Sequence, residues 1–448
     1  MPLHELRRVT VRVRPRFFLL SLLASAALSA CGGSAVPPSP GSAAAAVSSQ
    51  AVTDAPGAVA WPQTYHDGGH TNFNPNETLL SAGNVSGLKE LAGLTIGNGV
   101  QALALSAGRL FVIGPSGTGN LLAAYNAKTF KLLWSENIGG TPLSTLAIDG
   151  NVVVTECTLS DGGNHFGGVC GYNTSSGAPV WQWGRSCGSS CVPESELDTP
   201  ITFENGVVYF GYLYEGDPAD YIVALNATTG GVIYDNSLGS VNRLNGHAPA
   251  VGGGNIFYSC FADSAVCAFN SSGGPLWKSA TGTPLNALAY SNGLVFDHYS
   301  YPTGNSGVLA LNPSNGAVVH SYTYCTQSCG NNPNPVAVAK GMVYVTSADN
   351  SGSLYAYHVG GALAWSKLNL AGATSPSVAN GVVYEPEAGS NSPTVQAFDA
   401  TTGALLWTSP YVGAQNGGIP GASAPVIANG ALYAVSNTCG FVCSFTVH

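Results

Sequence analysis

Charged residues are scarce in this sequence. Asp, Glu, Lys and Arg make up only 8% of its 448 residues, whereas they make up about 25% of a typical soluble domain. Coiled coils and helical bundles need charged side chains along their exposed faces, and nucleic-acid-binding proteins need a basic surface. Because the formal net charge is −9, the composition excludes both classes.

Long apolar runs are also missing. A single short one lies near the N-terminus, which excludes a protein that crosses a membrane many times. A disordered chain is excluded as well, because the sequence contains 7 Trp, 20 Tyr and 15 Phe. With 58 Gly and 27 Pro, what remains is a turn-rich, mostly β protein of the secreted type, whose surface is polar through Asn, Ser, Thr and Gly.

The N-terminus has the organisation of an export signal. Five arginines between Arg7 and Arg16 precede an apolar run over residues 17–27, which is too short to span a bilayer as a mature helix. The segment 28–31 (Leu-Ser-Ala-Cys) resembles a bacterial lipobox. That resemblance implies cleavage before Cys31 and lipidation of its thiol. Ordinary signal cleavage, with Cys31 left unmodified, is the alternative.

We therefore divide the chain into a lipoprotein signal peptide (1–30), a flexible low-complexity tether (31–55), a lead-in segment (56–84) and a folded region (85–448). Without the signal peptide the chain carries nine basic and 22 acidic residues, a net charge of −13. Nucleic acid is a poor partner for such a surface. We expect the mature protein in the bacterial cell envelope, on its periplasmic face or at the cell surface, held at a membrane by the lipid anchor.

Ten cysteines remain when Cys31 is set aside, and they form five local pairs. An even, locally paired set in an exported chain indicates disulfides formed in an oxidising compartment. No His lies at zinc-ligand spacing from the closely spaced pairs, so we expect no metal site. The predicted disulfides are Cys157–Cys170, Cys187–Cys191, Cys260–Cys267, Cys325–Cys329 and Cys439–Cys443.

An internal repeat dominates the sequence. Its clearest copy, residues 396–407, contains an Asp, a Thr-Gly pair and a final Trp. Successive copies lie 41 to 53 residues apart, which is the length of a β-propeller blade. The related segments are residues 124–134, 171–181, 224–230, 268–277, 310–316 and 356–365, with a truncated copy at 444–446.

A second series runs half a period out of phase with the first. In it, Asn-Gly or a similar pair separates apolar runs, which is the strongest short signal for a β-hairpin. Each unit therefore predicts four strands, A to D, with an Asn-Gly turn between A and B and a Thr-Gly turn between C and D. The Trp of strand D is suited to packing between blades. The eight copies are 107–111, 149–153, 204–209, 254–257, 291–296, 340–344, 379–384 and 428–433.

The last copy ends at His448 without a strand D. Residues 88–96 precede the first strand A and can supply the missing strand. Closure by strands from both termini removes the free edges of an open sheet. The sequence thus predicts an all-β fold, an eight-bladed β-propeller of four-stranded antiparallel blades over residues 85–448, with seven blades as the alternative.

The repeat unit, Ala-[Phe/Leu/Tyr]-[Asp/Asn]-x-x-[Thr/Ser]-Gly-x-x-x-Trp, resembles the pyrroloquinoline-quinone-type (PQQ-like) propeller repeat. That superfamily includes the quinoprotein dehydrogenases and the propeller lipoprotein of the outer-membrane assembly machinery. The resemblance covers residues 61–448, and the segment 61–75 is similar to the opening segment of the dehydrogenases. It implies the fold far more specifically than the activity.

The resemblance also implies what a quinoprotein dehydrogenase would need. Such enzymes hold PQQ between a disulfide of adjacent cysteines and a Trp, beside a calcium ion and a catalytic Asp. This chain has no adjacent cysteines, and only Trp183 lies outside the repeat and lead-in positions. No calcium ligand or catalytic residue can be carried over. We therefore expect no cofactor, and PQQ with calcium only if the chain is a divergent quinoprotein.

The variable B–C and D–A connections share one end of a propeller, which we name the loop face; the tight A–B and C–D turns form the opposite turn face. Loops held on a rigid scaffold are natural binding surfaces, and the cysteine pairs bracket or lie within these loops. One polar group there could bind a cation or be a solvated acidic loop. Its candidate ligand-binding residues are Glu194, Glu196, Asp198, Tyr212, Tyr214, Glu215 and Asp217.

A second candidate group is the segment 297–299 (Asp-His-Tyr), expected in another B–C loop. His298 and Tyr299 there could bind a sugar or act as acid and base, unless the loop is merely solvated. The lead-in contains three polar residues expected to order it, His66, Asp67 and His70. Together these features favour a non-catalytic, lipid-anchored propeller that binds an envelope protein, a glycan or a small ligand. A PQQ-dependent oxidoreductase is the alternative.

Overall fold

The computed structural model describes most of the chain after residue 59, in the ranges 60–95, 100–117, 119–140, 145–161, 164–185, 196–213, 219–239, 244, 246–260, 264–280, 287–300, 305–325, 335–347, 352–370, 375–387, 394–410, 424–436 and 441–447. The predicted signal peptide, Cys31 and the tether lie outside these ranges. The helix of the described residues is the short 3-10 turn η1 (Val85–Gly87), and the rest of the regular structure is β. No helix in these ranges is long and apolar enough to cross a membrane.

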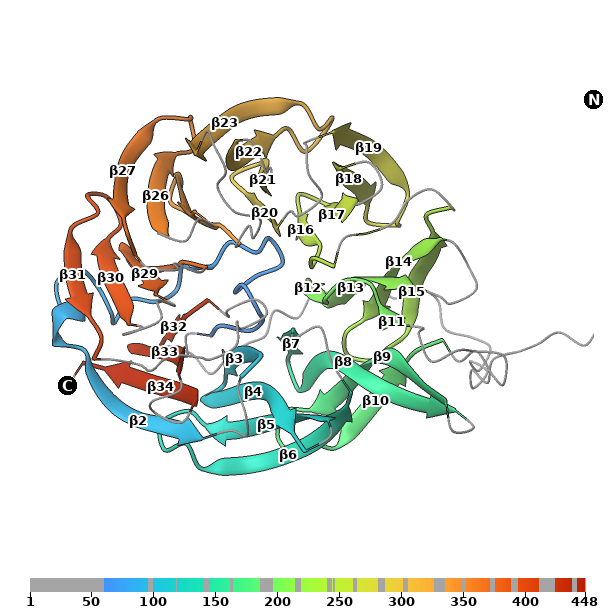
Figure 1. Cartoon of the computed structure of the whole chain (residues 1–448). Coiled ribbons are helices and arrows are strands. Elements are labelled where there is room, and N and C mark those ends of the chain that lie inside the picture. The colour runs from blue at the N-terminus through green and yellow to red at the C-terminus, as the bar shows by residue number, and fades with distance from the viewer. Residues whose placement is uncertain are drawn as a thin grey trace, which may run out of the picture. The chain divides into compact units, whose positions relative to one another are not determined.

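Eight antiparallel sheets form the blades of a propeller around a central axis (Figure 1). In each blade strand A is innermost, and strands B, C and D follow outward. The first four blades are β3 (Ala102–Ser106), β4 (Arg109–Ser116), β5 (Gly119–Asn126), β6 (Leu132–Gly139); β7 (Leu146–Asp149), β8 (Val152–Asp161), β9 (Asn164–Asn173), β10 (Pro179–Trp183); β12 (Thr202–Glu204), β13 (Val207–Leu213), β14 (Asp220–Asn226), β15 (Val232–Ser237); and β16 (Ala250–Gly252), β17 (Asn255–Cys260), β18 (Ala265–Asn270), β19 (Pro275–Ala280).

The other four blades complete the ring, and the predicted all-β, eight-bladed fold is confirmed. Two short strands add to it: β1 (Phe73–Asn74) pairs in parallel with β28, and β11 (Glu196–Leu197) pairs with β13. Blades five to eight are β20 (Ala287–Ser291), β21 (Leu294–Ser300), β22 (Ser306–Leu311), β23 (Val318–Cys325); β24 (Ala337–Ala339), β25 (Met342–Thr346), β26 (Ser353–His358), β27 (Leu363–Leu368); β28 (Ser377–Ala379), β29 (Val382–Pro386), β30 (Val395–Asp399), β31 (Leu405–Thr408); and β32 (Val426–Ala428), β33 (Ala431–Ser436), β34 (Phe441–Thr446), β2 (Lys89–Thr95).

Strand β2 closes the ring as the sequence predicts. It is the outermost strand of blade eight and pairs antiparallel with the C-terminal strand β34, from Lys89 opposite Thr446 to Thr95 opposite Phe441. Strand β2, from the N-terminal part of the chain, and the last strand β34 therefore lie in one sheet (Figure 1). Because β2 covers the outer edge of β34, blade eight has the same four strands as the other blades, and the C-terminal strand is not left as an open sheet edge.

The repeat residues act at the contacts between blades. In blade three the Asn226 carboxamide oxygen accepts the backbone N–H groups of Thr228 and Thr229 at 3.1 and 2.9 Å, which fixes the C–D turn. Gly230 follows with φ +70°, and a Cβ there would lie 2.6 Å from the Trp181 ring of blade two. Trp181 donates its indole N–H to the Ala227 carbonyl at 2.9 Å. The predicted role of Trp between blades is thus confirmed.

The same bond recurs around the ring. An indole N–H donates to a carbonyl of the next blade from four further tryptophans, at 2.8 to 3.1 Å: Trp134 to Thr174, Trp277 to Pro313, Trp365 to Ala400 and Trp407 to Leu88. Each bond satisfies a backbone carbonyl and holds two neighbouring blades together. The Trp of the repeat therefore serves mainly to hold neighbouring blades together in the ring.

Every outermost strand carries a β-bulge one residue before the Trp position. In blade three, Ala224 pairs with Tyr234 and Leu225 with Val232, so Ile233 has no partner in the ladder. Ile233 and Val232 are 50% and 53% exposed. Bulges on edge strands obstruct pairing with a second chain, so these edges can carry exposed aliphatic residues without offering a template for aggregation.

Two predicted disulfides are confirmed, Cys157–Cys170 and Cys260–Cys267. Each joins strands B and C of one blade near the loop face. Cys325 and Cys443 are also disulfide-bonded, and their predicted partners, like the Cys187–Cys191 pair, lie outside the described residues.

Candidate functional site

The lead-in segment runs around the inside of the ring and contacts all eight blades. The innermost strand of a blade has one edge without a strand neighbour, so its backbone groups need other partners. In seven blades the same N–H group, two residues before the A–B turn, is satisfied by the lead-in at 2.6 to 2.9 Å. The pairs are Leu105 with the Trp61 carbonyl, Ile148 with Pro62, Phe203 with the Gln63 side chain, Val251 with Gly68, Tyr290 with Gly69, Val338 with Thr71 and Val378 with Asn72.

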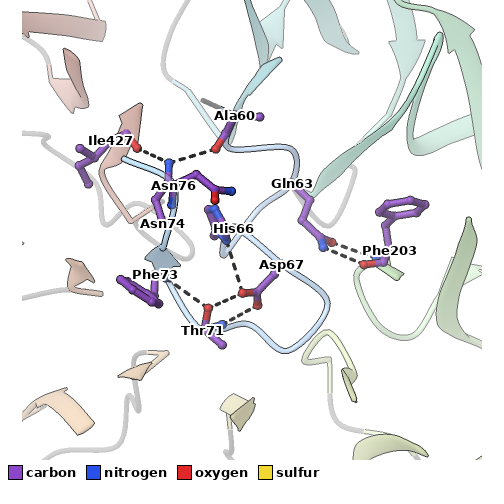
Figure 2. Close-up of polar contacts among 10 residues, drawn as sticks. All are labelled: Ala60, Gln63, His66, Asp67, Thr71, Phe73, Asn74, Asn76, Phe203 and Ile427. Atoms are coloured by element: carbon purple, nitrogen blue, oxygen red, sulfur yellow. Dashed lines mark hydrogen bonds and ion pairs between the residues drawn. The ribbon is translucent and has the colours of Figure 1, made fainter. Parts of the chain in front are cut away.

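Blade eight is held by a side chain instead of the backbone. The Asn74 amide donates to the Ile427 carbonyl at 2.8 Å and to the Ala60 carbonyl at 3.0 Å (Figure 2). This pair of bonds joins the two ends of the inner circle. At blade three the side chain of Gln63 also acts as a donor, from its amide to the Phe203 carbonyl at 2.7 Å.

The lead-in can follow this circle because of its unusual backbone. Tyr65, His66, His70 and Asn72 all have positive φ, between 48° and 77°, a region that costs a non-glycine residue free energy unless tertiary contacts compensate. A Cβ on Gly69 would lie 2.4 Å from the Tyr290 carbonyl oxygen. Glycine is thus required where the segment approaches strand β20 most closely.

Asp67 connects His66 and Thr71 within the lead-in (Figure 2). Its carboxylate accepts the Thr71 backbone N–H at 2.9 Å and the Thr71 hydroxyl, and it lies 3.4 Å from the His66 imidazole. Burial tends to raise the pKa of Asp67, but the contacts with His66 and Thr71 outweigh it and lower that pKa below its usual value. The carboxylate is therefore ionised and engaged in a structural role.

His70 crosses the interior between blades three and five. It is 3% exposed, with Nδ1 3.3 Å from the Leu288 carbonyl and Nε2 2.8 Å from the Thr202 hydroxyl. A carbonyl can only accept, so Nδ1 carries the proton and Nε2 accepts from Thr202. Burial lowers the pKa of His70 to about 4, against smaller opposing effects of Asp67 and the Leu288 carbonyl. The expectation that these polar residues order the lead-in is confirmed.

Two further buried carboxylates serve the same structural purpose, and neither is marked by a motif in the sequence. Glu77, 1% exposed, accepts the N–H groups of Leu79 and Leu80 and that of Gly430 in blade eight, at 3.0 Å. Glu156, 3% exposed, bonds to Thr145 and to the Ile201 N–H of the next blade. Burial raises the pKa of Glu156. Single carboxylates without a motif are not recognisable in one sequence.

The predicted acidic group on the loop face is only partly within the described residues. Glu194, Tyr214, Glu215 and Asp217 lie outside them. Glu196 and Leu197 form strand β11, in which Leu197 pairs with Tyr212. Asp198 follows this strand and donates its backbone N–H to the Gly211 carbonyl at 2.9 Å. Tyr212 is fully buried, with its hydroxyl 3.3 Å from the Gly167 carbonyl. The described ranges contain no group of three or more His, Cys, Asp or Glu side chains that could hold a metal ion.

The segment 297–299 is not the loop that the sequence predicted. It lies within strand β21, and Asp297, His298 and Tyr299 are buried. Strand B of blade five is seven residues long, like that of blade three, and it stays paired with β22 through Ser300. His298 Nε2 lies 2.7 Å from the Tyr324 hydroxyl, and the Tyr299 hydroxyl lies 3.5 Å from that of Thr323.

The residues present do not fit a bound quinone of the dehydrogenase type. Five tryptophans are engaged between blades, as described above. Trp61 is 1% exposed and packs edge-on against His66, and Trp183 packs edge-on against Phe210 and Tyr212. The sequence also lacks adjacent cysteines. All seven indoles thus pack or form hydrogen bonds within the propeller.

Comparison with known proteins places the repeats in a family. A family model described as outer membrane protein assembly factor BamB matches residues 47–211, 183–334 and 262–446. No curated protein matches the sequence.

Solved structures of three other proteins share the fold at low identity. The quinohemoprotein alcohol dehydrogenase from Comamonas testosteroni superposes with a TM-score of 0.62 at 13% identity, covering 87% of this chain and 80% of its own. A europium-containing methanol dehydrogenase gives 0.60 at 11%, covering 84% and 90%. The computationally designed Ika8 protein gives 0.58 at 16%, covering 80% and 100%. A designed protein among the neighbours underlines that this likeness concerns architecture alone.

Proposed function

Because the chain belongs to the family of the outer membrane protein assembly factor BamB, we propose that it is a non-catalytic, lipid-anchored propeller of the bacterial cell envelope. It acts as a binding or scaffold module, and its partner binds at the loop face. Cys31 carries the lipid, and the tether joins it to the propeller.

The observation that supports this proposal most directly is the use of the aromatic groups between blades and of the ionisable groups in the lead-in. The indoles between blades, and the side chains of Asp67, His70 and Glu77, all bond within the chain. Groups committed to structure in this way are poorly placed to bind a cofactor or transfer a proton to a substrate. The loop face, whose connections are braced by disulfides, is then the surface best suited to bind a partner.

The competing function is a quinoprotein oxidoreductase, and titration of the purified protein with PQQ and Ca²⁺ separates the two. We expect no saturable heat of binding and no turnover in a dye-linked alcohol assay. Tight quinone binding accompanied by turnover would overturn the proposal.

The anchor is tested separately in cells. The Cys31→Ala variant should move from the membrane fraction to the soluble fraction, and Cys157→Ala with Cys170→Ala, which removes a disulfide far from the signal, should leave fractionation unchanged. Retention of Cys31→Ala at the membrane would rule out the lipid anchor while leaving the binding role to be tested by itself.

A further inference from the structure

The eight blades provide an internal comparison that separates structural residues from others. A feature that recurs at the same place in every blade serves the ring, as the Trp bonds do. A feature confined to one interface is not needed for the fold, and such departures from a repeat are expected at functional sites. The interface between blades five and six contains the clearest departure.

The outer strand of blade five lacks the Trp of the repeat, and its row of aromatic side chains is longer than the pair Trp181 and Trp183 in blade two. His320 replaces the Trp, and Tyr322 and Tyr324 follow on the same side. Tyr322 takes over the bond between blades, with its hydroxyl 2.6 Å from the Val359 carbonyl of blade six. Tyr324 is therefore not required for that contact.

The facing strand of blade six departs from the repeat as well. Tyr355 precedes the alanine that pairs with the Trp position. No other blade has an aromatic residue at this position, where the seven equivalents are Ala123, Cys170, Val223, Cys267, Leu309, Gln396 and Cys443. Both departures thus lie on opposite sides of one interface.

These side chains form an ordered aromatic group at the loop face. The Tyr324 and Tyr355 rings stack with centroids 5.4 Å apart and planes within 19° of parallel. Tyr357 continues the stack below Tyr355 at 6.3 Å, and the buried His298 bonds to the Tyr324 hydroxyl at 2.7 Å. Tyr324 and Tyr355 are partly exposed, whereas His298 and Tyr357 are buried.

The position of the group fits recognition at the loop face. Tyr324 is the penultimate residue of β23, which ends toward the D–A connection, and Tyr355 is the third residue of β26, which begins after the B–C connection. His298 lies near the end of β21 on the same side. Rigid strands therefore present phenol rings whose orientation is fixed by a second layer of contacts, as a preorganised site requires.

We propose that Tyr324 and Tyr355 form a binding site for a neutral glycan, with the C–H face of a sugar ring against the exposed phenol surface. Phenols combine an apolar ring with a hydroxyl, which matches the alternating apolar and hydroxyl surfaces of a pyranose. A neutral sugar is favoured because the mature chain carries a net charge of −13, which repels acidic polysaccharides. This inference rests on the proposed binding role and names its ligand class.

The test is calorimetric titration of the mature protein with cellohexaose, maltohexaose and chitohexaose. At least one should bind with a Kd below about 1 mM. Tyr355→Ala should weaken that binding tenfold or more, and Tyr355→Phe should retain most of it, because the stacking surface remains. Tyr324→Phe, which removes the hydroxyl held by His298, should weaken it two- to fivefold.

Tyr290→Ala is the matched control, because Tyr290 is also partly exposed and stacks on Phe257 at 5.7 Å and 11°, but on the turn-face side of its strand. Its binding should equal that of the wild type. Circular dichroism and melting temperature confirm that each variant is folded. Absence of binding by all three hexasaccharides, or equal binding by folded Tyr355→Ala, would overturn the glycan site without affecting the test of PQQ turnover. Quinone binding that Tyr355→Ala abolishes would instead assign the group to a flat aromatic ligand and also overturn it.

Discussion

The Trp407 indole donates a hydrogen bond to the Leu88 carbonyl at 3.1 Å, across 319 residues of sequence. Blade seven thereby holds the chain just before it forms the outer strand of blade eight. The Leu88 residue is 5% exposed, so its carbonyl would lose this partner without access to bulk water. Like the other bonds of the series it joins consecutive blades, but its acceptor comes from the N-terminal part of the chain that completes blade eight.

The substitution Trp407→Phe should lower the free energy of unfolding by about 1–2 kcal/mol, the usual effect of leaving a buried acceptor unpaired. Urea denaturation measures it. Trp183→Phe is the control, because the Trp183 indole nitrogen has no hydrogen-bond partner among the described residues and packs only edge-on against Phe210 and Tyr212. If both variants lose the same stability, the hydrogen bond has no special role in closure.

Two glycines with similar backbone angles should respond differently to alanine. Gly381 in an A–B turn has φ +79° and open space around its Cβ position, whereas Gly403 has φ +68° and a Cβ position 2.6 Å from the Trp365 ring. Gly381→Ala should cost about 1–2 kcal/mol for the left-handed backbone. Gly403→Ala should cost at least about 1 kcal/mol more, because the ring must also move. Equal losses in denaturation experiments would show that the Trp365 contact is easily displaced.

The buried Glu77 should stabilise the lead-in on the ring. Its carboxylate accepts three backbone N–H groups, including that of Gly430 from blade eight. Glu77→Ala leaves these donors without their partner and should lower the unfolding free energy by about 2–4 kcal/mol. The exposed Glu90→Ala in β2 should change it by less than about 0.5 kcal/mol. Limited proteolysis should cut the lead-in sooner in Glu77→Ala, and unchanged proteolysis would argue against its anchoring role.

The periodic part of this architecture was predictable from the sequence. Asn205-Gly206 and its equivalents adopt the positive φ angles that the hairpins require, 50° and 81° at this pair. The residues of β2 could be assigned to the closing strand because the last repeat lacks a strand D and the apolar segment before the first strand A belongs to no other blade. Both inferences use local patterns that recur, so each copy supports the others.

The parts that were not predictable lack such repetition. Residues 60–74 have no period, and their circle is fixed by contacts with eight separate strands rather than by local propensity. The length of a B strand is likewise set by its partner: β21 remains paired to Ser300, which places His298 in a strand instead of a loop. Tyr324 and Tyr355 lie in different blades and come into contact only because blades five and six pack side by side.

Acidification should destabilise the protein through His70. Its pKa is lowered by burial to about 4 from an ordinary value of 6.5, so the unfolded chain binds the proton first as the pH falls. The stabilisation is complete above pH 6.5 and is lost progressively toward pH 4, by up to about 3 kcal/mol. His247, whose pKa burial also lowers to about 4, contributes in the same window and with the same sign.

Comparison of variants isolates the contribution of His70 to the loss of unfolding free energy at low pH. His70→Gln retains a donor and an acceptor but cannot titrate, so its loss of unfolding free energy between pH 7 and pH 4.5 should be smaller than that of the wild type by about 2 kcal/mol. The exposed His165→Gln should follow the wild type. Urea denaturation at the two pH values measures all three proteins. An equal loss in wild type and His70→Gln would mean that the acid sensitivity arises elsewhere and that the interior imidazole can be protonated at little cost.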